Sequence, residues 1–370
     1  MARAWAEIDL AAVRHNVAAL REHVAPARVC GVVKANGYGH GAVAVGRAAL
    51  EAGADWLAVA QVDEAAALRA AGVEAPLIVL SEPCADEADA AVATGARLTV
   101  YTPGAVHALA AAARRRGGGP VPVHLKVDTG MRRVGVEPPD AVGTAKAIAA
   151  TDELVLEGVF THFPVADEPG NPFTARQIDR FEAVLRDLQA AGFTPDIVHA
   201  ANSAAALVHP AARYDMVRTG IALYGISPAP GLAGTVELRQ ALTLASEVAF
   251  VKRVPAGEGV SYGLRQITTG DTVVATVPIG YADGVFRALP VAGQEVLVQG
   301  RRCPMIGVVT MDQLMIDLGP DADVAVGEPV VLLGAQGDEM ITPDEWAARL
   351  DTISYEVVCA IGPRVERRHR

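Results

Sequence analysis

Two hydrophobic patterns alternate along the first two thirds of the chain. Short apolar runs are separated by alanine-rich segments with helical periodicity. The apolar runs predict eight strands: Val29–Lys34, Trp56–Gln61, Leu77–Ser81, Arg97–Tyr101, Val121–Val127, Leu154–Thr161, Asp196–Ala200 and Tyr214–Arg218. The segments between them predict helices: Ala42–Ala52, Asp63–Ala71, Asp86–Thr94, Pro103–Arg115, Pro139–Ala150, Phe173–Ala191 and Ser203–Val208. This eightfold alternation predicts an α/β fold, a (β/α)₈ barrel, and the near-continuous apolar strands suit a buried parallel sheet.

A doubly wound open sheet has the same alternation and is the alternative architecture. The distribution of polar residues favours the barrel, because they fall at or just beyond the C-terminal ends of the predicted strands: Lys34, Lys126, His162, Asn202, Ser203 and Arg218. A barrel gathers those strand ends into one mouth.

The pattern changes near Leu232, where alternating strands replace helices. Strands are predicted over Leu242–Val254, Thr272–Ile279, Glu295–Gln299, Leu314–Asp317 and Val330–Leu333. Only Pro343–Leu350 has a helical pattern, with Thr342 as its N-cap and Glu345 completing a capping box. We therefore expect a barrel domain over residues 1–231 and a mostly β domain over 232–370.

The start of the chain precedes the barrel pattern. Ala4–Leu10 alternates like a strand, and a helix is expected from about Leu10 to Val24. These first ten or so residues are candidates for pairing with the β domain. Only the last few residues of the chain are expected to be disordered.

Composition narrows the class of protein. The formal net charge of −11 argues against nucleic-acid binding. The first residues lack the apolar core of a signal peptide, no uninterrupted apolar run has the length expected of a membrane span, and the four cysteines form no Cys-x-x-Cys pair. We expect a cytoplasmic protein in a reducing compartment, without a metal site or a membrane partner.

The segment Val29–Gly41 carries the most specific chemistry. Its apolar run ends in Lys34, and a glycine-rich stretch containing Tyr38 follows. An isolated lysine here would simply mark a strand end where its charge reaches water. However, Lys-Ala-Asn-Gly-Tyr-Gly-His-Gly resembles the pyridoxal phosphate (PLP) attachment motif of the alanine racemase family. The resemblance implies that Lys34 holds the cofactor as a Schiff base and that Tyr38 lies at its phosphate.

Two later segments extend the predicted cofactor site. Barrels often bind phosphate with backbone amides of the last two strand-end loops, which here makes Ser203, Gly220 and Ile221 the predicted ligands. Alone, Ser203 could equally be a helix N-cap. The segments His199-Ala-Ala-Asn-Ser-Ala and Arg218-Thr-Gly-Ile resemble the same family, whose pattern adds Asn202 to the cofactor site. In that family the residue matching Arg218 donates to the pyridine nitrogen.

The segment Lys126-Val-Asp-Thr-Gly-Met-Arg-Arg also resembles the family. The resemblance implies that Arg133 contacts the cofactor phenolic oxygen and the substrate carboxylate. It assigns no role to Arg132. The lysine matching Lys126 is carbamylated in some members. His162 matches a histidine beside the cofactor ring, although a buried packing histidine is the ordinary alternative.

The β domain contains the matching second half of the site. Gly259-Val-Ser-Tyr-Gly resembles the family segment whose tyrosine is the second catalytic base, which implies that role for Tyr262. The resemblance also implies that Met311 and Asp312 contact the substrate and that Tyr355 lies at the cofactor and the substrate corridor. Val308 and Thr310 stand where family members often have arginine and cysteine, which leaves the substrate and inhibitor range open.

Taken over nearly the whole chain, the resemblance implies a PLP-dependent racemase. It would interconvert L- and D-alanine with two bases, Lys34 and Tyr262 of the other subunit in a head-to-tail homodimer, and supply D-alanine for peptidoglycan. A racemase acting on serine or a bulkier amino acid is the first alternative. A non-catalytic PLP-binding protein on the same barrel is the second, and the presence of the β domain and its tyrosine disfavours it.

Overall fold

The computed structural model describes residues 4–370, which form two compact units. One unit comprises residues 12–37 and 42–239. The other comprises the described residues 4–11, the short stretch Tyr38–Gly41, and Gln240–Arg370. No helix within residues 4–370 combines the length and apolar character that a membrane crossing requires.

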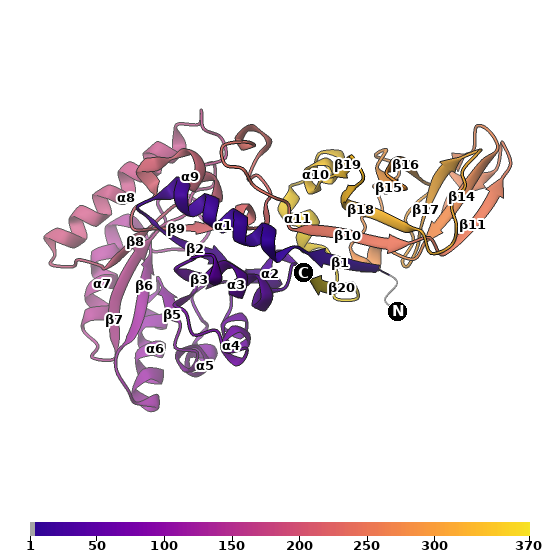
Figure 1. Ribbon diagram of the computed structural model, residues 1–370. Helices are drawn as coiled ribbons and strands as arrows, with labels where there is room; N and C mark the ends of the chain where they lie inside the picture. Colours follow the sequence, from indigo (N-terminus) through magenta and orange to yellow (C-terminus); the bar gives the residue numbers. More distant parts are fainter. Residues whose placement is uncertain (1–3) are drawn as a thin grey trace. The chain divides into compact units, whose positions relative to one another are not determined.

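The first unit is a closed barrel of eight parallel strands (Figure 1). The strands are β2 (Arg28–Val32), β3 (Trp56–Val59), β4 (Leu77–Val79), β5 (Arg97–Val100), β6 (Val121–Lys126), β7 (Leu154–Phe160), β8 (Ile197–His199) and β9 (Met216–Thr219). Pairing of β2 with β9, with Arg28 opposite Met216, closes the ring. The barrel prediction is confirmed, and the open-sheet alternative is wrong.

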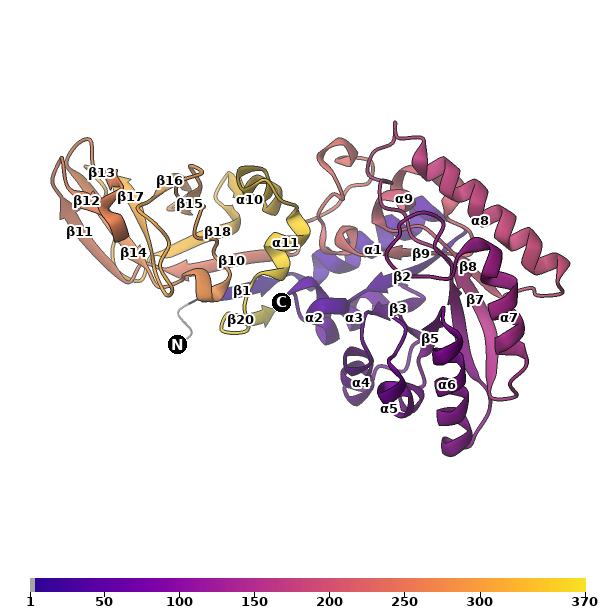
Figure 2. The same cartoon turned by 180° about the vertical axis from the view of Figure 1, so that it is seen from behind.

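Helices surround the strands, as both views of the barrel show (Figures 1 and 2). They are α3 (Ala42–Glu51), α4 (Val62–Ala70), α5 (Ala88–Ala93), α6 (Pro103–Arg116), α7 (Ala141–Ala149), α8 (Phe173–Ala190) and α9 (Ser203–Val208). All seven match predicted segments, and α1 (Leu10–Val24) lies at the expected place. The boundaries follow local chemistry: Pro103 opens α6, and the Thr102 hydroxyl accepts a hydrogen bond from the Ala105 amide at 3.2 Å.

The pairing of β6 with β7 contains an irregularity. Val123 lies opposite Leu156, but the next residue, His124, lies opposite Gly158. Glu157 is therefore an extra residue in β7, which is the arrangement of a β-bulge. Such bulges change the direction of a side chain in an otherwise regular strand.

The second unit is built on a sheet of mostly antiparallel strands. It contains β1 (Ala4–Ile8), β10 (Leu242–Glu247), β11 (Phe250–Val254), β14 (Thr272–Val277), β15 (Glu295–Val298), β16 (Arg301–Ile306), β17 (Leu314–Gly319), β18 (Pro329–Gln336), β19 (Glu339–Ile341) and β20 (Glu366–His369). A separate two-stranded sheet joins β12 (Gly259–Val260) to β13 (Gln266–Ile267). The mostly β prediction is confirmed.

The single strand predicted over Leu242–Val254 is wrong. It is two strands, because β10 pairs with β1 and β18 whereas β11 pairs with β14. The break falls at Val248 and Ala249, which belong to neither β10 nor β11. Their amides donate to the carbonyls of Glu328 and Thr276. An alternating pattern that continues without a turn signal does not reveal that the strand changes its pairing partner.

Two further expectations for the C-terminal region fail. A second helix, α11 (Ser354–Cys359), follows α10 (Pro343–Leu350), so the latter is not the only one. The last residues are ordered, because β20 pairs in parallel with β1, with Trp5 opposite Glu366. The charged side chains of these residues give no strand pattern in the sequence, although their backbone groups form the hydrogen bonds of a strand.

Of the two hydrogen bonds that make up the capping box expected at α10, one is formed. The Thr342 hydroxyl accepts from the Glu345 amide at 3.2 Å, as predicted. The Glu345 carboxylate instead accepts hydrogen bonds from Arg302 and Gln294. A partly buried ion pair with Arg302 thus takes the place of the local bond to the N-cap amide.

Candidate active site

Lys34 lies just after β2, at the C-terminal end of the barrel, and is half-buried. The four residues after it form a left-handed turn, with φ of 52° at Ala35, 52° at Asn36, 62° at Gly37 and 50° at Tyr38. This conformation costs L-residues about 1–2 kcal/mol each. Such strain persists only where the surroundings fix it, and it is concentrated at functional sites.

Side chains from neighbouring segments fix this turn. The Asn36 side-chain oxygen accepts from the Ala42 amide at 3.1 Å. One carboxylate oxygen of Glu64 accepts from the Ala35 amide, next to Lys34, and the other from the two amides that precede α4. The backbone that carries the Lys34 amine is therefore tied to the following strand-end loop. Glu64 was not among the predicted site residues.

Lys126 lies at the end of β6, buried among cations. Burial, and then the charges of Arg133, Arg218 and Lys34, lower the pKa of Lys126 to about 8, opposed only by Asp128. Lys34, Lys126 and Arg218, each predicted at a strand end, therefore lie near one another in the barrel. Several positive charges with so little compensation favour the binding of an anion.

Arg218 on β9 is 4% exposed and is held by fixed acceptors. One guanidinium nitrogen donates to the carbonyls of Thr161 at 2.8 Å and Ala200 at 3.0 Å, and to Nδ1 of His162 at 3.1 Å. Burial lowers the pKa of Arg218 to about 10. Burial, and then the Arg218 charge, lower the pKa of His162 well below its usual value. His162 is thus a neutral imidazole that accepts from a guanidinium cation.

Two adjacent arginines follow β6 but have different surroundings. Arg132 forms an exposed ion pair with Glu137 at 2.6 Å. Arg133 is also exposed, but its charge contributes to the low pKa values of Lys126 and His162. Of the two, Arg133 is therefore the one associated with the cation cluster.

The last two strand-end loops meet at Ser203. Its hydroxyl oxygen accepts from the Gly220 amide at 2.8 Å, which leaves the hydroxyl proton to be donated elsewhere. Ser203, Gly220 and Ile221 are all buried. The N-cap of α9 is Asn202, whose side chain accepts from Ala205 at 3.0 Å. The N-cap alternative for Ser203 is therefore wrong.

The remaining predicted residues belong to the β-rich unit. Tyr38 is buried beside Tyr355, with ring centroids 6.1 Å apart, and burial raises the pKa of Tyr38. Tyr262 is 74% exposed and follows Ser261, whose hydroxyl donates to the Val308 carbonyl at 3.0 Å.

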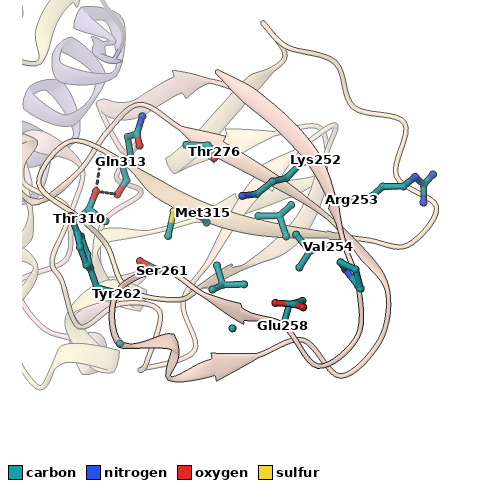
Figure 3. A pocket seen from close by; sticks show the side chains of 15 residues that line it. Lys252, Arg253, Val254, Glu258, Ser261, Tyr262, Thr276, Thr310, Gln313 and Met315 are labelled. Carbon is teal, nitrogen blue, oxygen red and sulfur yellow. Dashed lines mark hydrogen bonds between the residues drawn. The ribbon is translucent and has the colours of Figure 1, made fainter.

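Tyr262 lines a cavity of about 760 Å³ in this unit (Figure 3). Lys252, Thr310 and Gln313 also line it. The Thr310 hydroxyl donates to the Gln313 carbonyl at 2.9 Å and so closes the loop that contains Met311 and Asp312.

Met311 and Asp312 are exposed and line a neighbouring cavity of about 800 Å³, which Tyr262 also borders. Asp312 pairs with Arg364 at 2.8 Å, and Arg364 also contacts Asp283 at 3.1 Å. Arg364 was not among the predicted site residues, and its place in the segment Gly362-Pro-Arg is the signal that could have indicated it.

Comparisons with known proteins agree with this geometry. The family models described as alanine racemase, N-terminal domain, and alanine racemase, C-terminal domain, match residues 8–228 and 241–369. The chain is 50% identical to the alanine racemase of Symbiobacterium thermophilum over 363 residues, 98% of this chain and 96% of that protein.

Solved structures show the same relationship. Alanine racemase from the D-cycloserine producer Streptomyces lavendulae superposes with a TM-score of 0.94 at 41% identity, covering 100% of this chain and 97% of that one. Histidine racemase from Leuconostoc mesenteroides gives 0.91 at 30% identity, covering 100% and 98%. With both family domains present in order and half of its residues identical to a curated member, the chain belongs to the alanine racemase family of isomerases.

Proposed function

We propose that this protein is a PLP-dependent racemase that interconverts L-alanine and D-alanine in the cytoplasm and supplies D-alanine for peptidoglycan. The observation that carries the proposal is the Lys34 amine on a fixed, strained turn within the cation cluster of Lys126, Arg133 and Arg218. An amine attaches the aldehyde of PLP, and the surrounding charges suit its phosphate and phenolate.

The residues present fit this cofactor. Lys34 would attach it. Ser203, Gly220, Ile221 and Tyr38 would hold its phosphate, with Asn202 and Tyr355 beside them, because the Ser203 hydroxyl proton is available to an anion. When bound, PLP withdraws electron density from the substrate Cα and so lowers the barrier to removing its proton. Arg133 would bind the substrate carboxylate.

Arg218 would face the pyridine nitrogen, with His162 beside it. A guanidinium donates a hydrogen bond without transferring its proton. The ring nitrogen would then stay neutral, and less negative charge would pass from Cα into the ring. This favours return of a proton to Cα, as racemisation requires.

Racemisation needs a proton-transfer group on each face of Cα. We assign Lys34 to the face from which D-alanine loses its proton and Tyr262 to the L-alanine face. The phenol would come from the partner subunit of a head-to-tail homodimer. The exposure of Tyr262 supports this assignment, as do the exposed apolar side chains Leu264, Ile267 and Met311 of the same unit.

Lys126 is a candidate for carbamylation. Its pKa of about 8 leaves a substantial fraction of neutral amine near neutral pH. The amine nitrogen would form a bond to carbon dioxide and lose one proton, giving an anionic carbamate. That anion would replace a cation next to Arg133 and help to orient it.

The test is a chiral assay of purified protein with PLP. L-alanine and D-alanine should each give the racemate, and Lys34→Ala should abolish both the activity and the absorbance of covalently attached cofactor. Persistence of that absorbance in the variant would reject Lys34 as the attachment site.

A serine racemase or one acting on a bulkier amino acid is the second candidate. It is favoured by the likeness to a histidine racemase and by Val308 and Thr310 in place of the frequent arginine and cysteine. A panel of L-amino acids assayed in parallel decides between the two. A larger kcat/KM for serine or histidine than for alanine would favour the second.

A further inference from the structure

A row of hydrogen-bonded side chains crosses the barrel interior from Arg218 to Glu157. The second terminal nitrogen of Arg218 lies 2.8 Å from Nδ1 of His199. Nε2 of His199 lies 2.8 Å from Nδ1 of His124, and Nε2 of His124 lies 3.1 Å from a carboxylate oxygen of Glu157. The four residues come from β9, β8, β6 and β7. Together they form what we call the polar row.

The chemistry of its ends fixes the direction of every hydrogen bond. A guanidinium can only donate, so Nδ1 of His199 accepts and its proton is on Nε2. This Nε2–H donates to Nδ1 of His124, whose own proton is then on Nε2 as well. That proton is donated to the carboxylate of Glu157, which only accepts. Both histidines are therefore neutral and in the same tautomer.

The protonation states agree with this direction. Burial lowers the pKa of both histidines. At His199, the Arg218 charge lowers the pKa further. Burial by itself would raise the pKa of Glu157, but hydrogen bonds from His124 and Arg97 outweigh it and bring the value to about 2. The row thus joins a buried cation to a carboxylate through two neutral rings.

Packing holds the two rings in place. Phe160 stacks on His199 with centroids 4.7 Å apart and planes within 7°. Gly158 leaves space for His124, because a Cβ at this position would lie 2.6 Å from the ring. The β-bulge at Glu157 places its carboxylate between His124 and Arg97, with Arg97 Nε 3.0 Å away.

We propose that Glu157 is a positioning residue for Arg218: by accepting the hydrogen bond at the far end of the row, it stabilises the tautomer of both histidines in which the guanidinium has an acceptor at Nδ1 of His199. This inference rests on the proposed function, in which Arg218 donates to the cofactor ring. Without the carboxylate, the Nε2–H of His124 loses its acceptor, and only the Arg218 end of the row still favours this tautomer. A proton on Nδ1 of His124 would face the Nε2–H of His199, and the rearranged His199 would turn an N–H toward Arg218.

The experiment compares Glu157→Leu and Glu157→Gln with Glu153→Gln. Leucine removes the acceptor, whereas glutamine offers one acceptor oxygen to two donors, His124 and Arg97. Glu153 is a matched control, because its side chain is also 17% exposed and also pairs with an arginine, Arg114, outside the row. The first readout is the ring-nitrogen tautomer in ¹⁵N-histidine-labelled holoprotein, assigned with His124→Gln.

The second readout is kinetic and spectroscopic. We expect both Glu157 variants to populate Nδ1–H forms of His124 and His199, to shift the absorbance of bound PLP, and to lower kcat about tenfold or more with little change in KM. Glu153→Gln should resemble wild type in every respect. If Glu157→Leu does not fold, Glu157→Gln is judged by the same measurements.

Two results would overturn the inference. One is retention of the wild-type tautomers in the Glu157 variants, or an equal shift in Glu153→Gln. The other is a tautomer change that leaves both kcat and the cofactor absorbance unaltered. If the wild-type protein racemises no amino acid, the proposed function fails on its own, and the tautomers and cofactor absorbance still decide the role of Glu157.

Discussion

At Lys126 the barrel holds an amine where its charged form is disfavoured, and this has a consequence for stability. The pKa is about 8 in the folded protein and near the usual 10.5 in the unfolded chain. Between these values the unfolded state binds more protons, so raising the pH through this window stabilises the fold. Below about pH 8, burial of the charged Lys126 amine lowers the free energy of unfolding by its full amount, on the order of 3 kcal/mol.

Lys126→Met should therefore be relatively most stabilising below pH 8, and its advantage over wild type should shrink between about pH 8 and 10.5. Urea unfolding of PLP-free protein in carbon dioxide-free buffer measures this, because carbamylation is then prevented. Lys146→Met, at an exposed position on α7, is the control. Parallel pH curves for wild type and Lys126→Met would contradict the assignment.

Tyr262 provides a test of the proposed division between the two bases. Tyr262→Phe removes only the hydroxyl from an exposed side chain, so the fold should be unaffected. We expect the rate to fall by roughly 10²–10⁴-fold, with a larger loss of Cα proton exchange from L-alanine than from D-alanine. Deuterium incorporation from heavy water into each isomer measures this difference.

Tyr214→Phe changes a tyrosine that precedes β9 and packs on Phe181, at the opposite end of the barrel strands from Lys34, and should leave both rates near wild type. Equal losses in the two directions for Tyr262→Phe would reject the assignment of the phenol to one face.

Among the structural elements, the left-handed turn after Lys34 depends on Glu64. Glu64→Gln reduces the charge-assisted hydrogen bonds to the Ala35 amide and to the start of α4. We expect a loss of about 1–3 kcal/mol in unfolding free energy and weaker PLP binding, because the Lys34 amine would be less well positioned. Chemical denaturation and cofactor titration measure the two effects.

The control variant Glu87→Gln distinguishes a general loss of stability from a specific loss of PLP binding. Glu87 caps another short strand-end helix by accepting from the Cys84 amide at 2.9 Å, but it is not bonded to the Lys34 turn. It should lower stability without changing the affinity for PLP. If both variants weaken PLP binding equally, Glu64 has no specific role at the turn.

The same turn shows where sequence-based prediction ends. Apolar periodicity located the eight barrel strands, because each strand is buried on both faces. It did not locate the left-handed turn, since Ala35, Asn36 and Tyr38 have no intrinsic preference strong enough to predict φ near 50°. Long-range contacts such as that of Glu64 impose it.

The polar row was missed for a similar reason. The sequence pattern placed Arg218 and His162 at strand ends, but it gave no role to His124, His199 or Glu157. Their roles depend on a one-residue bulge in β7 and on which side chains of the neighbouring strands β6 to β9 face one another. Neither feature has a local sequence pattern, because a bulge is a property of pairing.

At the scale of the whole molecule, the proposed catalytic groups are divided between two compact units. Lys34 and the cation cluster belong to the barrel unit, and Tyr262, Met311 and Asp312 belong to the β-rich unit. The ordered motifs of the sequence indicated both sets of residues. They could not show which chain completes which site, because that depends on assembly.

Mixing two inactive variants tests assembly directly. Lys34→Ala and Tyr262→Phe each inactivate one half of the proposed site. In a head-to-tail homodimer, a mixed dimer has one site with both substitutions and one with neither. Random exchange of equal amounts should restore roughly a quarter of the wild-type activity, because half of the dimers are mixed and each has one intact site.

The controls follow from the same symmetry. Each variant mixed only with itself should stay inactive, and mixing either variant with Lys34→Ala/Tyr262→Phe should restore nothing, because no site would then be intact. Subunit exchange is verified by sedimentation of tagged and untagged protein. If exchange is complete and activity does not return, Lys34 and Tyr262 act within one chain, and the exposed phenol must reach the barrel of its own subunit.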